Sequence, residues 1–545
     1  MTGLVVRRAL LDYARRPLNL VLLVAVPVVM VVALGGELAS FSKLLSATAK
    51  PPHLDVATAG WAAAAVAGLA GFFQAIASRA TDRRLAAASA RGATPVVAGR
   101  LTAAFALVLA AATAAIAALG TRAGVTDPAR VASTIVLVAV IYLAIGVLVG
   151  TLVRSQMNGA LVVSVIWMLD VFVGAGLGGS SSVITRFFPL HFPTMILTSQ
   201  AAHHGGPLGD VGWSLIWTVG LATLAVGRLA STTRATHRAH LNPSAPMVPT
   251  APPSRAAAPG EVEVGSESTT PRHRTEHQVQ VPLPTVVEGW KVPASPTAAG
   301  LWAAVREYRR NRVFWVLLIA VPVLFIALAA QETPTKAMPV ALVYGPRQVT
   351  ALLSLRQVHA AEMASVASAL LAGVAGLFVV TGSAEGDRRL VLAGFRPRQL
   401  LGGQLGIIAG AAVLTSTVSL AMSAAWISPH QWVEYAAADL LIALTYAMVG
   451  VLLGPMVGRL GGLYLILLLA IVDVGYGQTV MFHPLPPAWG AFLPARGAGR
   501  LLIDGAFTAS FEQYGHLLLG LGWLMALTAA AALTFRHQTG QGSVR

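Results

Sequence analysis

Apolar stretches long enough to cross a lipid bilayer recur along the whole chain of 545 residues. A membrane-spanning helix needs about 20 consecutive, mostly apolar residues. Twelve stretches approach this requirement: 18–36, 57–77, 97–120, 131–153, 159–178, 211–229, 313–331, 362–382, 403–426, 436–457, 461–479 and 514–534. The sequence therefore predicts an all-α integral membrane protein with about twelve transmembrane helices, within a range of ten to twelve.

The composition excludes several other classes of protein. Only 11% of the residues are charged and 56% are hydrophobic, whereas about a quarter of the residues of a soluble protein are charged. The chain has no Cys, which excludes a disulfide framework, a Cys-based metal site and a cysteine nucleophile. The net charge of +16 would suggest nucleic-acid binding in a soluble protein, but here the basic residues flank the apolar stretches. We therefore expect a lipid bilayer as the surrounding partner, and no nucleic acid.

The distribution of Lys and Arg predicts the orientation in the membrane, because cytoplasmic loops carry the excess of these residues. A cytoplasmic N-terminus places most of the 38 Lys and Arg residues on the cytoplasmic side. We therefore expect a multi-pass plasma-membrane protein with both termini in the cytoplasm.

The two halves of the chain are copies of each other. The segment LLVAVPV at 22–28 recurs as LLIAVPV at 317–323, and DRRL at 82–85 recurs at 387–390. Each half has an even number of spans with its basic loops on the same side, which predicts two parallel six-helix repeats related by an axis along the membrane normal. The expected organisation is a first transmembrane unit at 1–234, a disordered Pro/Ser-rich cytoplasmic linker at 235–300, a second unit at 301–537 and a tail at 538–545.

A basic amphipathic stretch precedes the first span of each half. Val6, Leu10 and Tyr13 share one helical face, and the same pattern recurs within 301–312. Such a stretch predicts a helix in the cytoplasmic membrane interface, although positive-inside anchoring alone would also explain its charges.

The loops between the second and third spans, 78–101 and 383–405, begin with charged residues and contain a Gly/Pro break. A short helix in each loop, parallel to the membrane, could transmit motion from a soluble motor to the spans. A solvated positive-inside loop is the alternative.

The order of basic arm, apolar span with an interior proline (Pro27, Pro322), second span and charged loop resembles the permeases of the ABC type-2 exporter family. The chain looks most like actinobacterial antibiotic and multidrug efflux permeases in which two six-span units are fused. The resemblance implies a permease that exports hydrophobic drugs, antibiotics or lipid-like compounds across the plasma membrane.

By this resemblance, the two charged loops would dock on ATPase subunits. The residues concerned are Asp82, Arg83, Arg84, Arg91, Glu385, Asp387, Arg388, Arg389 and Arg396. The chain contains no G-x-x-x-x-G-K-[S/T] phosphate loop, so we do not expect it to be an enzyme or to carry a cofactor. ATP and Mg are expected on a separate ABC ATPase chain, in two copies per permease.

Two acidic residues, Asp170 and Asp473, lie near the middle of the two fifth spans. A carboxylate at mid-membrane costs roughly 2.5 to 3.5 kcal/mol. These residues therefore belong either to a substrate path or proton-coupled site, or to a hydrogen-bonded structural position. With nearby aromatic residues they define a candidate substrate cavity: Phe72, Phe73, Trp167, Asp170, Phe172, Phe378, Asp473 and Tyr476. Packing or contact with lipid is the alternative for the aromatic residues.

Small residues and prolines predict further local structure. Gly146 and Gly150, like Gly450 and Gly454, allow close packing of the fourth spans. Segments 180–210 and 480–513 contain prolines and aromatic residues and are expected to form short re-entrant or external helices. Their histidines lack acidic or Cys neighbours, so no metal site is expected.

The main rival class is a proton-coupled drug antiporter of the major facilitator type, which also has twelve spans in parallel halves. Its hallmark loop reads G-x-x-x-D-R/K-x-G-R-R/K. Here the spacing from Gly382 to Asp387 is one residue too long, and Arg389 is followed by Leu-Val-Leu. The sequence therefore favours the ATP-driven exporter, with the antiporter as the alternative.

Overall fold

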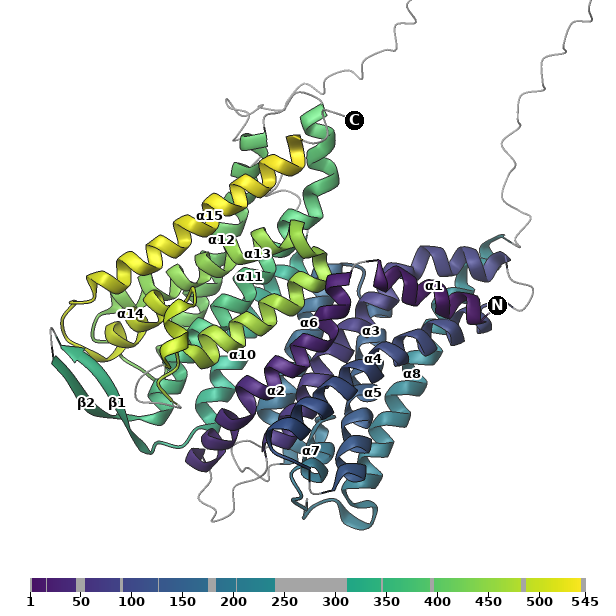
Figure 1. Cartoon of the computed structure of the whole chain (residues 1–545), viewed down its shortest axis with the longest axis horizontal. Helices are drawn as coiled ribbons and strands as arrows, with labels where there is room; N and C mark the ends of the chain where they lie inside the picture. Colours follow the sequence, from purple (N-terminus) through teal and green to yellow (C-terminus); the bar gives the residue numbers. More distant parts are fainter. Residues whose placement is uncertain are drawn as a thin grey trace, which may run out of the picture.

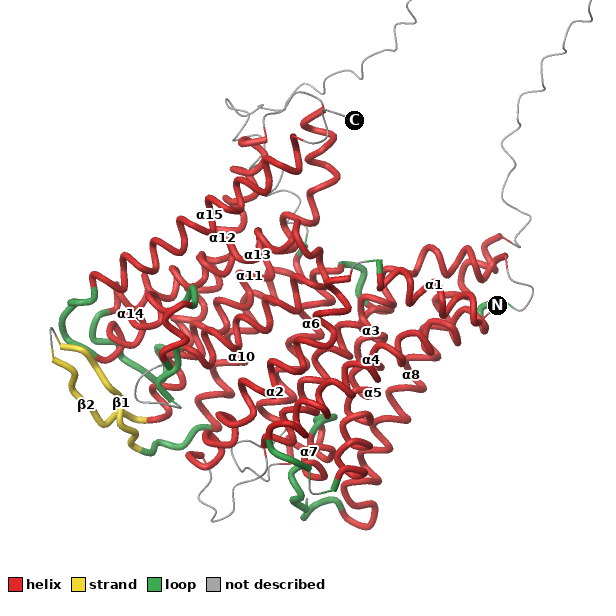
Figure 2. The backbone as a smooth tube through the Cα atoms, viewed as in Figure 1, coloured by secondary structure: helices red, strands yellow, loops and turns green. Residues whose placement is uncertain are grey.

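Helices make up nearly all of the computed structural model, and the described residues contain a single β-hairpin (Figure 2). The structure describes residues 2–15, 17–45, 54–88, 92–125, 127–174, 183–201, 203–240, 311–344, 347–392, 397–481 and 487–540. The prediction of a helical protein is thus confirmed, and the hairpin is an exception to the predicted all-α class.

The first half begins with the predicted arm helix and continues through six long or medium helices. Its elements are α1 (Thr2–Ala14), α2 (Pro17–Leu45), α3 (Leu54–Ala88), α4 (Thr94–Arg122), α5 (Pro128–Leu152), α6 (Gln156–Leu169), π-helix η1 (Asp170–Gly174), η2 (Val183–Phe187), α7 (His191–Leu197), η3 (Gly206–Leu208) and α8 (Gly209–His240).

Among the described residues, the second half follows the same order, apart from a hairpin and one merged helix. Its elements are α10 (Arg312–Glu332), β1 (Ala337–Tyr344), β2 (Arg347–Ser354), α11 (Leu355–Leu392), α12 (Pro397–Ser423), α13 (Trp432–Leu469), π-helix η4 (Ala470–Gly477), η5 (Ala488–Phe492), α14 (Arg496–Phe507) and α15 (Tyr514–Gly540). The hairpin precedes α11, and the single helix α13 corresponds to α5 and α6.

Capping residues explain where several of these helices begin. Asp127 precedes α5 and its side chain accepts a hydrogen bond from the Arg130 backbone N–H, while Pro128 occupies the first helical turn. Ser155 caps α6 in the same way, and Asn311 caps α10. Polar residues in short turns thus mark the helix starts within an otherwise apolar sequence.

Ten helices in the described part of the chain are long and apolar enough to span a membrane, at the lower end of the predicted range. The difference from twelve arises at the two fifth spans. Helix α6 has only 14 residues before η1. In the second half, α13 and η4 form one stretch of 46 residues, interrupted at Gly458. At about 1.5 Å per residue this stretch is more than twice as long as the bilayer core is thick.

The duplication is visible in matching contacts. A Cβ placed on Gly146 in α5 would overlap the carbonyl oxygen of Gly68 in α3, and a Cβ on Gly450 in α13 would overlap that of Gly373 in α11. The predicted close approach of the glycine-containing fourth spans is therefore confirmed in both halves.

The two halves lie side by side (Figure 1). Helix α2 of the first half packs on α13 of the second, and α10 packs on α6. Asn158 and Asn311 exchange side-chain hydrogen bonds of 2.7 and 3.2 Å across this interface, and the Tyr464 hydroxyl donates to the Val66 carbonyl at 3.0 Å. The first span of each half thus contacts the fifth-span segment of the other.

The first arm forms the expected amphipathic helix, α1, whose buried residues are Val5, Ala9 and Tyr13. Val6 and Leu10 of the predicted face are half-buried beside them. Residues 301–310, which would form the second arm, and 241–300 of the predicted linker lie outside the described residues. Helix α8 continues to His240, so the predicted linker boundary at 235 is a few residues too early.

The hairpin β1–β2 is the element that the all-α expectation missed. Its antiparallel register pairs Ala337 with Ser354 and Tyr344 with Arg347. The β-branched residues of the segment and the Gly-Pro at 345–346 were the available signals. The hairpin lies at the lower left of Figure 1, at the end of the second half remote from the C-terminal end of α15.

Candidate functional site

A cavity of about 590 Å³ lies where the two halves meet. This volume is within the usual range for small-molecule sites. The first half lines it with Arg8, Ala9, Asp12, Tyr13, Asn19, Ala70, Phe73, Gln74, Ala77, Ser78, Thr81, Arg100 and Gln156, and the second half with Thr381, Gly458, Arg459 and Leu460. Both halves are therefore needed to form its wall.

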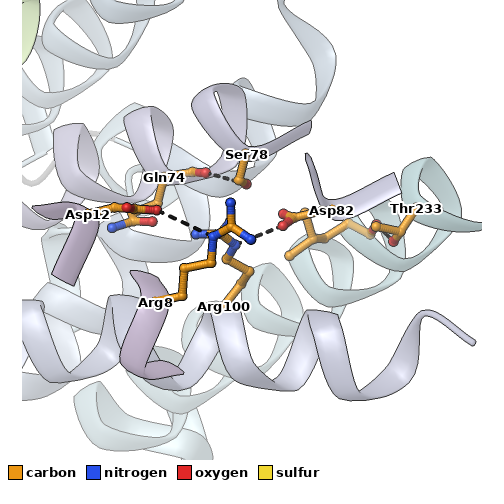
Figure 3. Close-up of polar contacts among 8 residues, drawn as sticks. Arg8, Asp12, Gln74, Ser78, Asp82, Arg100 and Thr233 are labelled. Carbon is orange, nitrogen blue, oxygen red and sulfur yellow. Dashed lines mark hydrogen bonds and ion pairs between the residues drawn. The ribbon is translucent and has the colours of Figure 1, made fainter. Parts of the chain in front are cut away.

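Charged residues of α1, α3 and α4 meet at one side of this cavity (Figure 3). The Arg100 Nε donates to the Asp82 Oδ1 at 2.9 Å, and both side chains are nearly buried, with exposed fractions of 11% and 4%. Arg8, which lies close to Arg100 in Figure 3, forms a weaker and exposed ion pair with Asp12 at 3.9 Å. The buried pair ties the second span to the third, whereas Arg8 stays accessible.

Arg459 supplies the cationic group from the second half. Its guanidinium donates to the Thr381 carbonyl at 2.8 Å and to the Thr381 hydroxyl at 3.3 Å, and it also reaches Gln156 of the first half. The preceding residue, Gly458, has φ 74°, a left-handed conformation that favours glycine. This break in α13 places Arg459 at the boundary of the two halves.

The second half has a counterpart of the Asp82–Arg100 pair. Gln404 donates its side-chain N–H to Asp387 at 2.6 Å, so a neutral amide replaces the guanidinium. Burial raises the pKa of the Asp387 carboxyl, and the hydrogen bonds from Gln404 and Ser383 only partly offset this effect. The two loops therefore differ in charge at equivalent positions.

In the described residues of the two charged loops, we find helix extensions in place of the separate short helices that we expected. Helix α3 continues through the loop start to Ala88, and α11 continues to Leu392. The physical reason is that residues 78–88 contain no helix breaker and are rich in good helix formers. The charged residues thus lie on extensions of the second spans.

The predicted docking residues divide into two groups on these extensions. Asp82 and Asp387 are buried, whereas Arg83, Arg84 and Arg389 are exposed. The side chains of Glu385 and Arg388, and residues Arg91 and Arg396, lie outside the described residues. Docking on an ATPase remains a prediction.

The two mid-span carboxylates occupy equivalent hydrogen-bonded positions. Asp170 accepts from the Tyr142 hydroxyl at 2.7 Å and from the Leu190 backbone N–H at 3.0 Å. Asp473 accepts from the Tyr446 hydroxyl at 2.8 Å and from the Ala495 backbone N–H at 2.9 Å. Each carboxylate thereby ties its fifth-span segment to the loop that precedes the short helix α7 or α14. A structural role accounts for these bonds, and a role in transport stays a prediction.

Of the predicted aromatic cavity residues, Phe73 lines the cavity between the halves. Phe72, Trp167 and Phe378 are packed in the core, and Tyr476 lies against Trp489 with ring centroids 5.4 Å apart. The side chain of Phe172 lies outside the described residues. The predicted aromatic residues therefore do not line one common cavity in the described part of the structure.

Sequence reasoning missed the charged residues of the cavity wall and several buried polar groups. The sequence predicts only an interfacial role for Arg8 and an orienting role for Arg100 and Arg459, although Arg459 interrupts an apolar stretch, a signal that could have been used. Glu362 and Asp439 in the second half are also fully or almost fully buried. Glu362 is bonded to the Val480 N–H at 2.7 Å and to the Thr479 hydroxyl, which links α11 to the segment after η4.

No protein-family model matches this chain, and no curated protein sequence is detectably similar to it. The fold and composition define its class as a multi-pass helical membrane protein, built from two repeated halves with a cavity between them.

Proposed function

We propose that this chain is the permease of an ATP-driven exporter, moving hydrophobic drugs, antibiotics or lipid-like compounds out of the cell. The observation that carries the proposal is the cavity of about 590 Å³ whose wall is shared by both halves. A compound held there contacts two bodies at once, so that a change in their relative position would alter its site. This is the arrangement that alternating access between parallel repeats requires.

The wall of the cavity suits an amphiphilic compound. Phe73, Tyr13 and Leu460 offer apolar surface, while Arg8 and Arg459 offer hydrogen-bond donors with positive charge. Ligand sites commonly combine such an apolar lining with a few polar groups. We infer that the cavity faces the cytoplasm, because the basic arm α1 contributes to it.

Energy would come from two copies of a separate ABC ATPase chain that binds ATP and Mg. The extensions of α3 and α11 beyond their apolar parts offer exposed arginines for docking, with Arg83 on one and Arg389 on the other. Asp82 is bonded to Arg100 beside the cavity, so movement of the α3 extension would be passed directly to α4. In this proposal the chain crosses the membrane twelve times. The fifth spans are α6–η1 in the first half and the part of α13 after Gly458 in the second. An even number of crossings places both termini in the cytoplasm.

The experiment is to reconstitute the chain with its co-encoded ATPase and to measure ATP hydrolysis with and without candidate drugs. We expect the drugs to stimulate ATP hydrolysis only when both chains are present. Ala77→Trp, which fills the cavity, should abolish the stimulation, whereas Ala110→Trp on the exposed face of α4 should not. Drug efflux by the isolated chain in a proton gradient would contradict the proposal and select the antiporter.

A further inference from the structure

Asp439 in α13 is a fully buried carboxylate surrounded by serine hydroxyls. Ser416 donates to its Oδ2 at 2.6 Å and Ser368 at 3.0 Å, and Ser419 lies 3.1 Å from Ser368. The exposed fraction of Asp439 is 0%, and its Oδ1 has no hydrogen-bond partner. Among the described residues, no Lys, Arg or His forms an ion pair with it.

Ser368 and Ser416 direct their hydroxyls toward Asp439, and Ser419 meets the hydroxyl of Ser368. A serine or threonine within a helix commonly bonds to the carbonyl of the preceding turn. Thr415 and Ser423 in α12 do so, at 2.8 and 3.0 Å. Ser368, Ser416 and Ser419 make no such bond in the described structure. Their hydroxyls are instead directed into one cluster.

The first half shows what these helices need for packing alone. Matched contacts give the register between the halves. Gly68 in α3 corresponds to Gly373 in α11, an offset of 305 residues. Tyr142 in α5 corresponds to Tyr446 in α13, and Arg100 in α4 to Gln404 in α12, both at an offset of 304 residues.

In this register, the positions of the cluster are alkyl residues in the first half. Ser368, Ser416, Ser419 and Asp439 correspond to Ala63, Ala112, Ala115 and Ile135, all of which are fully buried. The same three-helix contact thus packs without any polar group. The cluster is therefore an addition specific to the second half, and an ionised carboxylate buried within a membrane-spanning helix costs free energy.

We propose that Asp439, Ser368, Ser416 and Ser419 form a binding site for a small monovalent cation of the size of Na⁺. The cluster supplies five oxygen atoms and one negative charge, and hard oxygen ligands suit hard cations rather than transition metals. Each hydroxyl oxygen has two lone pairs. Rotation about the Cβ–Oγ bond would turn a hydroxyl that donates a hydrogen bond to the carboxylate into one whose oxygen coordinates the cation. A bound cation would neutralise Asp439 and occupy the unpaired Oδ1. The site shares no residue with the cavity between the halves, so this proposal does not rest on the transport function.

The test measures binding of radioactive Na⁺ to the purified full-length chain in detergent by scintillation proximity. Saturable binding is expected, with K⁺ competing poorly. Asp439→Asn should abolish it, and Ser416→Ala should weaken it by about tenfold, comparable to losing one hydrogen bond to a charged group. Ser416→Ala reproduces the Ala112 of the first half, so the helix contact tolerates it, and a melting curve confirms that each variant is folded.

Thr417→Ala is the matched control, because Thr417 is exposed on the same helix and bonds its own backbone at Val413. It should bind Na⁺ as the unmodified protein does. Absence of saturable Na⁺ binding, or binding that survives Asp439→Asn, would overturn the proposal. A response of Asp439 to pH without Na⁺ binding would overturn it too, in favour of a site that holds only a proton.

Discussion

At the scale of single residues, the buried carboxylates differ in how fully their oxygens are bonded. Asp473 has donors from Tyr446, Gln478 and the Ala495 backbone, whereas Asp439 has hydroxyl donors on one oxygen and none on the other. A carboxylate that receives several hydrogen bonds is a stable structural group. An incompletely bonded one retains capacity for a further partner.

The bonded carboxylates give a stability prediction. Tyr446→Phe removes one donor to Asp473 and should lower the free energy of unfolding by about 1.5 to 3 kcal/mol, as for a hydrogen bond to a charged group. Equilibrium unfolding in detergent measures this loss. Tyr514→Phe is the control, since Tyr514 is 65% exposed and its replacement should change the stability by less than about 0.5 kcal/mol. Equal effects of the two changes would contradict the structural role of the Asp473 bond.

Asp387 gives a prediction about pH. Because burial raises its pKa in the folded protein, the folded state holds this proton more tightly than the unfolded state does. Its contribution to stability is complete below the ordinary pKa of an aspartate and is lost as the pH rises through the raised pKa. Asp387→Asn lacks this loss, so the variant should gain stability relative to the unmodified protein as the pH rises from about 4 to 7. Melting temperatures of the variant and the unmodified protein, measured across this pH range, test this prediction. A difference between the two that does not change with pH would refute it.

At the scale of elements, the contact between the second and fourth spans is the most closely packed part of each half. The backbones of α3 and α5, and of α11 and α13, approach through glycines, so that no side chain separates them. Sequence spacing predicted this contact because two glycines four residues apart lie on one helical face. The hairpin and the long α13 were not predicted, because apolar sequence alone does not mark where one helix ends.

Replacing a glycine at this contact should force the helices apart. Gly450→Ala places a methyl group against the Gly373 carbonyl and should destabilise the protein by about 1 to 3 kcal/mol or more. Gly410→Ala in α12 meets nothing within 4 Å and should be neutral, or stabilising by up to about 1 kcal/mol. Unfolding free energies of both variants test the difference. A Gly450→Ala protein as stable as the Gly410→Ala protein would show that the helices can separate at no cost.

At the scale of the whole molecule, the two halves share one interface and one cavity but differ in chemistry. An ion pair beside the cavity in the first half becomes a carboxylate–amide contact in the second, and an alkyl core becomes a serine–carboxylate cluster. Duplication explains the common framework. The two copies therefore keep the same framework but differ in their buried polar groups.

The absence of Cys makes the orientation directly testable. Arg83→Cys and Arg389→Cys should react with a membrane-impermeant maleimide from the same side, because parallel repeats place both helix extensions there. Leu352→Cys on the hairpin should react only from the other side, since β2 precedes and Arg389 follows the apolar part of α11. Leu352 is 74% exposed, so its labelling is not limited by burial. Labelling of positions 83 and 389 from opposite faces would rule out the parallel arrangement.

The sequence by itself determined the membrane class, most of the helical segments and the duplication. Apolar runs of about 20 residues and repeated motifs are local properties that need no knowledge of packing. Only the tertiary structure decided which side chains meet. Ser368, Ser416 and Asp439 lie on three helices, and Arg459 reaches Thr381 and Gln156 from the break at Gly458 in α13, the helix that also carries Asp439. Helices that are apolar on all sides carry no pattern that fixes their rotation, so packing between them determines where the cavity and the carboxylate cluster form.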